Sequence, residues 1–277
     1  DIMEYLKNFN YQISGNPGGH KLVFLHGLMG SLSNWRKITP PFENDYQILT
    51  FDQRGHGRSF KPATGYAPSD FANDLREILD EIGWEKIVLV GHSMGGRNAL
   101  EFAHLFPQRT EKLVLEDISP GKGRDAMLVL EKLVDKVPTP FPSRSKARDF
   151  FENTYVKLIS FHPQPQVIQR FLYTNLEEKG DGTLDWRFSK DGVMQALHAG
   201  HAQDRWESVE ELTIPTLWMR GEFSEDLSRP VYEEILHRNS SIRGVEIPGA
   251  GHWIHFDQPD AFIHSVKDFL TDGRFVG

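Results

Sequence analysis

The chain has 277 residues, a formal net charge of −8 at pH 7, 39% hydrophobic residues and no cysteine. This length fits one α/β domain with a sizeable core, and the acidic balance argues against a nucleic-acid partner, which requires a basic surface. The absence of cysteine excludes disulfides, cysteine nucleophiles and thiolate metal sites. No apolar segment approaches the roughly 20 residues that cross a bilayer, and residues 1–5 show no signal-peptide pattern, so we expect a cytoplasmic protein without a membrane span.

Short apolar segments alternate along the chain with segments of helical periodicity. This alternation predicts an α/β fold with a mostly parallel, eight-stranded sheet and helices on both faces. An antiparallel pair around residues 9–13 is expected at one edge. The other predicted strands, most of them apolar on both faces as buried parallel strands are, are 21–26, 46–52, 86–90, 112–118, 216–220 and 242–247.

The predicted helices lie between these strands. The first covers 70–82, with Ser69 as its N-cap and Gly83 as its end, and its apolar residues recur at helical spacing. A second helix opens at Met94 directly after a strand and runs to about residue 106. The last covers 259–270. Helices at these places would cover the sheet on both sides.

The stretch 120–206 breaks the alternation because it contains no convincing strand. It has two proline-rich breaks and amphipathic segments at 125–137, 145–159 and 189–197. We interpret it as an all-helical insertion, and such insertions commonly act as lids. The predicted organisation is therefore an α/β core formed by 1–119 and 207–277, with a helical cap, 120–206, inserted between two core strands.

Residues 91–95 read Gly-His-Ser-Met-Gly, which matches the pattern G-x-S-x-G. The pattern follows a predicted strand and opens a predicted helix, which is the context of a nucleophile elbow. A sharp turn there projects the oxygen of Ser93 above the sheet, and glycines on either side remove Cβ atoms that would collide with the backbone. We therefore predict Ser93 as a catalytic nucleophile.

A nucleophilic serine also needs an oxyanion hole and a base. The loop 26–31 reads His-Gly-Leu-Met-Gly-Ser after a strand, and we expect the backbone N–H groups of Leu28 and Met94 to form the oxyanion hole. His252 lies in a glycine-containing loop after the last strand. A neutral imidazole there can accept the serine proton near pH 7, so His252 is the predicted base.

The base needs a carboxylate, for which two places are open. The usual one, after the strand 216–220, holds Ser224 where an aspartate is expected, with Glu222 and Asp226 out of phase as alternative acids. The other is Asp117, at the end of the strand 112–118 and at the same sheet edge as Ser93. We favour Asp117.

These motifs resemble the α/β-hydrolase superfamily over essentially the whole chain, and most closely the YbfF-type bacterial esterases. The segments that carry the resemblance are 26–31, 34–35, 52–59, 91–96, 117–120 (Asp-Ile-Ser-Pro) and 249–253 (Gly-Ala-Gly-His-Trp). The resemblance implies a catalytic acid from Asp117, a helical cap and activity on short- to medium-chain acyl esters. It also implies that Ser224 acts as a supporting residue near His252.

The pocket is expected to be formed by residues at these motifs and in the cap. The expected pocket residues are His26, Met29, His92, Trp186 and Trp253. The insertion is rich in apolar side chains, which predicts an apolar acyl pocket and a preference for uncharged esters.

The sequence thus predicts a serine carboxylesterase working through an acyl-enzyme intermediate. A serine at the elbow disfavours dehalogenases and epoxide hydrolases, which need an aspartate nucleophile. A thioesterase, lactonase, carbon–carbon bond hydrolase, perhydrolase or lyase stays open, as does a small-molecule sensor without turnover. We expect a small-molecule ester substrate, no cofactor, no metal, and a monomer or small homo-oligomer.

Overall fold

The computed structural model describes residues 3–272, except for the side chains of residues 124–126. Its central sheet has seven strands in the order β1-β3-β2-β4-β5-β8-β9. The edge strand β1 pairs with β3 in the antiparallel direction, and the other neighbours pair in parallel. The strands are β1 (Tyr11–Gly15), β2 (His20–Leu25), β3 (Tyr46–Phe51), β4 (Ile87–His92), β5 (Thr110–Glu116), β8 (Thr216–Gly221) and β9 (Ile242–Ile247).

The mostly parallel sheet is confirmed, but the described residues give it seven strands where eight were expected. The expected eighth strand preceded β1, where the chain instead forms the short 3₁₀ helix η1 (Leu6–Asn8). The carboxylate of Glu81 accepts hydrogen bonds from the backbone N–H groups of Tyr5 and Leu6, at 2.6 and 2.7 Å. Phe9 packs edge-on against Phe51. The backbone here therefore bonds to the side chain of Glu81 and not to the backbone of a neighbouring strand.

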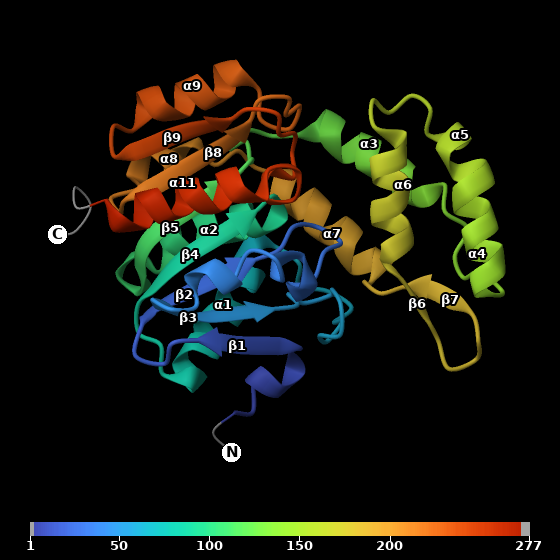
Figure 1. Cartoon of the computed structure of the whole chain (residues 1–277), viewed down its shortest axis with the longest axis horizontal. Coiled ribbons are helices and arrows are strands. Elements are labelled where there is room, and N and C mark those ends of the chain that lie inside the picture. The colour runs from blue at the N-terminus through green and yellow to red at the C-terminus, as the bar shows by residue number, and fades with distance from the viewer. Residues whose placement is uncertain (1–2, 273–277) are drawn as a thin grey trace.

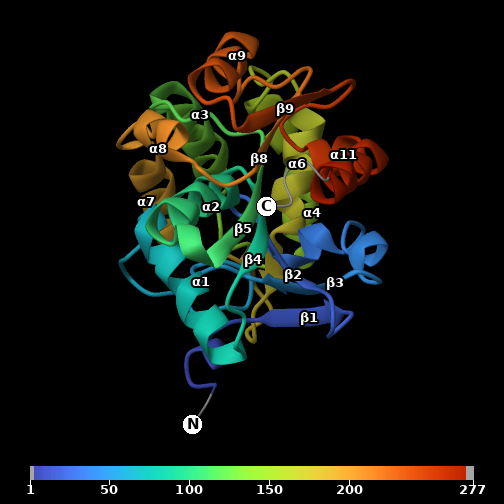
Figure 2. The ribbon, with the colours of Figure 1, turned by 90° about the vertical axis from the view of Figure 1, so that its left-hand side faces the viewer.

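Helices cover both faces of this sheet. Figure 2 shows α1, α2 and α8 on one face and α11 on the other. Each side has its own apolar cluster packed against the strands. The helices of this part are α1 (Pro68–Ile82), α2 (Met94–Leu105), α8 (Trp206–Glu211), α9 (Arg229–Arg238), α10 (Ile254–Asp257) and α11 (Pro259–Thr271), with short 3₁₀ turns η2 (Leu32–Trp35), η3 (Pro40–Phe42) and η4 (Pro107–Arg109).

The first long helix begins earlier than its sequence signals indicate. Its N-cap is Ala67 and not Ser69, because Pro68 fits the first helical position and the carboxylate of Asp70 accepts the Ala67 N–H at 3.0 Å. The end at Gly83 is as expected, since this residue has a φ of 75°. A left-handed glycine is a common helix end.

The segment between β5 and β8 forms a separate layer beyond one end of the sheet (Figure 1). It is mostly helical but not all-helical, because an antiparallel pair of short strands lies between its last two helices. The turn of this hairpin includes Gly182 with a φ of 84°, and Leu176, Leu184 and Trp186 bury their side chains. The elements are α3 (Arg124–Asp135), α4 (Arg144–Phe150), the π-helical turn η5 (Phe151–Tyr155), α5 (Val156–Leu158), α6 (Pro165–Thr174), β6 (Leu176–Glu178), β7 (Leu184–Trp186) and α7 (Lys190–His201).

Candidate active site

Ser93 stands at a sharp turn between β4 and α2. Its backbone has φ 56° and ψ −121°, and it is the N-cap of α2. A Cβ atom on Gly91 would lie 2.3 Å from the Gly95 carbonyl oxygen, and one on Gly95 would lie 2.4 Å from the Leu25 carbonyl oxygen. No side chain fits at either position, so the two glycines of the pattern let strand and helix approach closely enough to make the turn.

Three non-glycine residues of the described chain have a positive φ, and all three line one cavity. They are Met29 (66°), Ser93 (56°) and Asp117 (58°). Such backbone conformations cost of order 1–3 kcal/mol each and persist where the surrounding structure enforces them, often at functional sites. The cavity has a volume of about 510 Å³.

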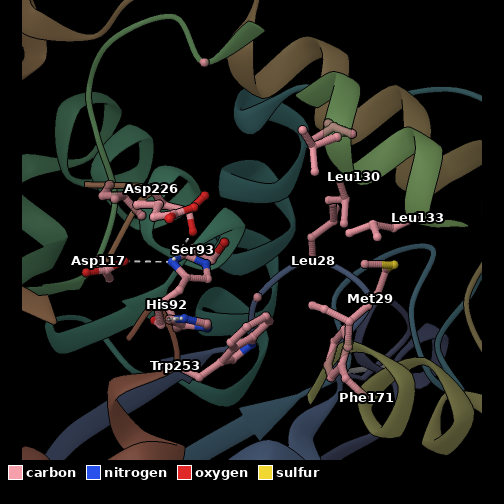
Figure 3. Close-up of a pocket in the computed structure, with 18 of the residues that line it drawn as sticks. Leu28, Met29, His92, Ser93, Asp117, Leu130, Leu133, Phe171, Asp226 and Trp253 are labelled. Carbon is pink, nitrogen blue, oxygen red and sulfur yellow. Dashed lines mark hydrogen bonds and ion pairs between the residues drawn. The ribbon is translucent and has the colours of Figure 1, made fainter. Parts of the chain in front are cut away.

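The cavity has a polar part and an apolar part. Figure 3 shows Ser93, Asp117 and Asp226 on one side, and Met29, Leu130 and Leu133 across from them. The polar side chains come from the ends of β4 and β5 and from the loop after β8. The apolar ones come from the loop after β2 and from α3. A substrate in this cavity would therefore contact both the sheet edge and the inserted segment.

His252 is held by two carboxylates. Its Nδ1 lies 2.8 Å from Asp117 Oδ2 and 3.1 Å from Asp226 Oδ2. Asp117 is fully buried and accepts two further hydrogen bonds, from the Gly221 N–H at 2.9 Å and from the Ser224 hydroxyl at 2.5 Å. The side chain of Asp226 is 45% exposed. Asp117 is thus the fixed partner of the imidazole and Asp226 the solvated one.

The other candidate acid lies elsewhere. Glu222 accepts the Gly249 N–H at 3.1 Å on the surface. Ser224 donates to Asp117 and accepts the Leu227 N–H at 3.1 Å. Its hydroxyl therefore orients the carboxylate that faces His252. The structure brings Asp117, Asp226 and Ser224 together with His252, and it gives Glu222 a different partner.

Neighbouring charge and burial shift the pKa values of the two cavity histidines in opposite directions. Burial acts to lower the pKa of His252, but Asp226 and Asp117 outweigh burial and raise it to about 9. Burial lowers the pKa of His92 to about 3. At neutral pH His252 is therefore mostly protonated in the free protein, and His92 is neutral.

Comparison with known proteins agrees with this geometry. The family model described as alpha/beta hydrolase fold matches residues 21–259. The chain belongs to this family. The sn-1-specific diacylglycerol lipase ABHD11 of Danio rerio is 34% identical over 272 residues, which cover 95% of this chain and 82% of the lipase. Esterase YbfF of Escherichia coli K12 is 28% identical, with 91% and 93% covered. The solved structure of a marine microorganism esterase superposes with a TM-score of 0.77 at 27% identity, over 94% and 98% of the two chains.

The protein is thus an α/β hydrolase with esterase and lipase relatives, and the family and fold expected from the sequence are confirmed. Within residues 3–272, none of the helices of this hydrolase is long and apolar enough to span a membrane.

Two of the expected pocket residues of the hydrolase do not line the cavity. Met29, His92 and Trp253 line it, but His26 and Trp186 are buried elsewhere. The Nε2 of His26 accepts the Gln53 N–H at 2.9 Å, which joins two loops below the site. Trp186 stacks on Phe188 at 4.8 Å. Both are packing residues, and no sequence pattern indicates which aromatic rings of the insertion face the cavity.

A second buried network of the hydrolase lies behind the first. The carboxylate of Glu116 accepts the backbone N–H of His255 at 3.0 Å and faces its Nδ1 at 2.8 Å. Burial acts to raise the pKa of Glu116, but His255 and His92 outweigh burial and lower it. His92 Nε2 donates to the carbonyl oxygen of His252 at 2.9 Å. This network holds the loop at His252 itself and at His255, three residues further along the chain.

Two groups of side chains in the hydrolase have metal-ligand types at close range. One is His92, Glu116 and His255, and the other is Asp117, Asp226 and His252. The bond between Glu116 and His255, and those from both aspartates to His252, already account for the close spacing within each group. That the hydrolase uses no metal therefore remains a prediction.

The sequence interpretation missed Arg97 and His201, which also line the cavity. The position of Arg97 could have been predicted from its spacing, because it follows Ser93 by one helical turn and residues at this spacing share a helix face. His201 belongs to α7, and no local pattern placed that helix next to the site.

Proposed function

We propose that this α/β hydrolase is a serine carboxylesterase that cleaves short- to medium-chain acyl esters through an acyl-enzyme intermediate. The observation that carries the proposal is the convergence of Ser93, His252 and Asp117 on one cavity, with Ser93 raised on a strained elbow. A hydroxyl that lines the same cavity as an imidazole oriented by a carboxylate is suited to nucleophilic attack on a carbonyl carbon. The esterase and lipase names of the relatives point to the same class of substrate.

In the proposed reaction, Ser93 Oγ attacks the ester carbonyl while His252 Nε2 takes its proton. His252 then gives this proton to the leaving alcohol, and a water activated by His252 releases the acid from Ser93. The backbone N–H groups of Leu28 and Met94 would stabilise the oxyanion. Within residues 3–272, neither group donates to a backbone carbonyl, so both are available to a ligand.

Asp117 is our proposed triad acid and Asp226 a second, modulating carboxylate. Asp117 is fixed by Gly221 and Ser224 and closed off from water, whereas Asp226 is partly solvated. A fixed carboxylate on Nδ1 keeps the proton there and leaves Nε2 free to accept one. An exposed carboxylate can move away from the imidazole and serves this purpose less well.

We further propose that residues 120–206 are the cap, which supplies one wall of the cavity. Leu130, Leu133, Ile168 and Leu172 come from α3 and α6 and line the cavity together with the core residue Leu28. An apolar wall of this kind suits an acyl chain, because burial of each CH₂ group contributes about 0.8 kcal/mol. Acyl chain length is therefore the property that this wall would select.

The first test is hydrolysis of 4-nitrophenyl acetate, butyrate, hexanoate and decanoate. We expect steady turnover with an optimum at butyrate or hexanoate, and a loss of at least about 1000-fold in kcat for Ser93→Ala. Ser240→Ala, at an exposed serine, is the matched control and should behave as wild type.

Undiminished turnover in Ser93→Ala would overturn the nucleophile assignment. If wild type hydrolyses none of the four esters, the assignment to uncharged short- to medium-chain esters is wrong. The same elbow would then be tested on acyl thioesters, lactones and carbon–carbon substrates, and for ligand binding without turnover.

A further inference from the structure

Arg97 is a cation built into the wall of the catalytic cavity. It lies on α2, and its backbone N–H donates to the Ser93 carbonyl oxygen at 3.0 Å, so it stands one helical turn after the proposed nucleophile. Residues at this spacing have Cβ atoms about 5–6 Å apart. Arg97, Ser93 and His201 line the same cavity.

The guanidinium of Arg97 lacks the partner that similar arginines of this chain have. Arg54, Arg205 and Arg220 are also largely buried, and they pair with Asp74, Glu101 and Glu246, respectively. The Nε of Arg97 is buried without a hydrogen-bond partner, and no carboxylate forms an ion pair with its guanidinium among the described side chains, which leave out those of residues 124–126. Buried charged groups in proteins are normally paired.

The surroundings of Arg97 keep it positive and do not neutralise it. Burial lowers its pKa to about 10, so the group stays protonated at neutral pH. The pKa of His201 is lowered to about 4, first by burial and then by Arg97, so this imidazole is neutral. Asp226 attracts Arg97 electrostatically, but its carboxylate pairs with His252. Among the described side chains, Arg97 is therefore a half-buried cation without an ion-pair partner, and it lines the cavity.

We propose that Arg97 binds a carboxylate carried by the substrate outside the scissile ester. The proposal rests on the proposed esterase function and names the substrate class more narrowly. A carboxylate a few bonds from the reacting carbonyl would give Arg97 its missing partner while the rest of the acyl chain packs against the apolar wall. Arginine suits this task because its planar fork binds a carboxylate with two parallel hydrogen bonds. The expectation of uncharged substrates, which rested on the apolar cap residues alone, is replaced by that of an acidic ester.

Two matched pairs of esters test the proposal and locate the carboxylate. Mono-4-nitrophenyl adipate against 4-nitrophenyl hexanoate places it on the acyl side. 4-(Butyryloxy)benzoate against phenyl butyrate places it on the alcohol side. We expect wild type to prefer the anionic member of at least one pair in kcat/KM by about 10- to 100-fold, the range of a hydrogen bond to a charged group.

Arg97→Met should bring the ratio of kcat/KM for the anionic and the neutral ester to about 1, while Arg97→Lys should keep part of the preference. Arg36→Met, at an exposed position, is the control and should keep the full preference. No preference for either anionic ester in wild type, or an unchanged preference in Arg97→Met, would overturn the proposal.

A binding experiment separates this proposal from the esterase proposal. In the Ser93→Ala background, monomethyl adipate and the uncharged dimethyl adipate are titrated calorimetrically into proteins with and without Arg97→Met. Monomethyl adipate binding that is at least about 10-fold weaker in the double variant, with a smaller loss for dimethyl adipate, supports the anion site even if no ester is turned over. Equal monomethyl adipate affinity in both proteins rejects the anion site whether or not the esters are hydrolysed.

Discussion

At the scale of single residues, the proposed chemistry depends on side chains whose environments differ although their types are the same. Asp117 and Asp226 both face Nδ1 of His252, but one is fully buried and the other 45% exposed. His252 has a raised pKa and His92 a lowered one, although their rings lie 4.8 Å apart. Neighbouring charge accounts for the first shift and burial for the second.

The two aspartates can be separated by their effects on the pH profile. A general base must be unprotonated, so a pKa of about 9 for His252 means that kcat/KM rises with pH up to about 9. Asp226→Asn removes one of the charges that favour the imidazolium. We expect the midpoint of the profile to move to lower pH and the activity at pH 7 to be kept or increased.

Asp117→Asn should instead lower kcat by up to about 10⁴-fold at every pH, because the amide no longer holds the imidazole in the required tautomer. Steady-state kinetics between pH 5 and 10 measures both variants. An unmoved midpoint for Asp226→Asn would contradict the modulating role of Asp226. A loss of activity as large as that of Asp117→Asn would point to Asp226 as the triad acid.

At the scale of elements, the elbow between β4 and α2 is the joint that brings the site together. The strand places Ser93 at the sheet edge, and the glycines allow α2 to pack against the strand without a gap. The next strand, β5, ends beside it and leads into Asp117, whose N–H donates to the Met219 carbonyl oxygen on β8 at 2.9 Å. Parallel strands end at a common edge, which is why residues distant in sequence meet there.

Gly91→Ala tests how tightly the elbow is packed. The added Cβ would lie 2.3 Å from a backbone oxygen that no rotamer change can move. We expect a loss of at least about 2 kcal/mol in the free energy of unfolding, typical of overpacking. Urea denaturation measures it. Gly180→Ala, where the added Cβ meets no atom within 4 Å, is the matched control and should change stability by less than about 0.5 kcal/mol. Similar losses for both variants would contradict the tight joint.

At the scale of the whole molecule, the inserted segment and the core share one apolar cluster. Leu28, Met29 and Met94 of the core belong to the same cluster as Phe151 and Tyr155 of the segment. Members of this cluster from both parts line the cavity, namely Leu28 and Met29 of the core and Leu133 and Leu172 of the segment, so their packing also determines its shape. We therefore expect the two parts to unfold together.

Phe151→Ala tests this coupling, because the side chain of Phe151 is fully buried in the shared cluster. The expected loss is about 3–5 kcal/mol in the free energy of unfolding, with far-UV circular dichroism and tryptophan fluorescence following one transition. Phe256→Ala, at a ring that is 72% exposed, should stay within about 0.5 kcal/mol of wild type. Two separate transitions would mean that the segment folds independently of the core.

The sequence by itself determined the sheet, the elbow and the family, because these depend on local patterns. Apolar strands between helical segments, the residues 91–95 and the glycine loop around His252 are each readable within a few residues. It also favoured Asp117, on its position at a strand end and on the resemblance to the YbfF-type esterases. Its errors lie at the chain start, where Glu81 replaces a strand partner, and in the insertion, where a short hairpin interrupts the helices.

The tertiary structure alone decided what faces the cavity and which charges stay unpaired. His26 and Trp186 turn into packed interior, and Arg97 and His201 line the cavity from two helices far apart in sequence. Asp117 and Asp226 meet at one imidazole from two different loops. These facts depend on the packing of the inserted segment against the sheet edge, where long-range burial selects the inward-facing side chains. Apart from the helical spacing of Arg97 from Ser93, no local pattern in the sequence encodes that selection.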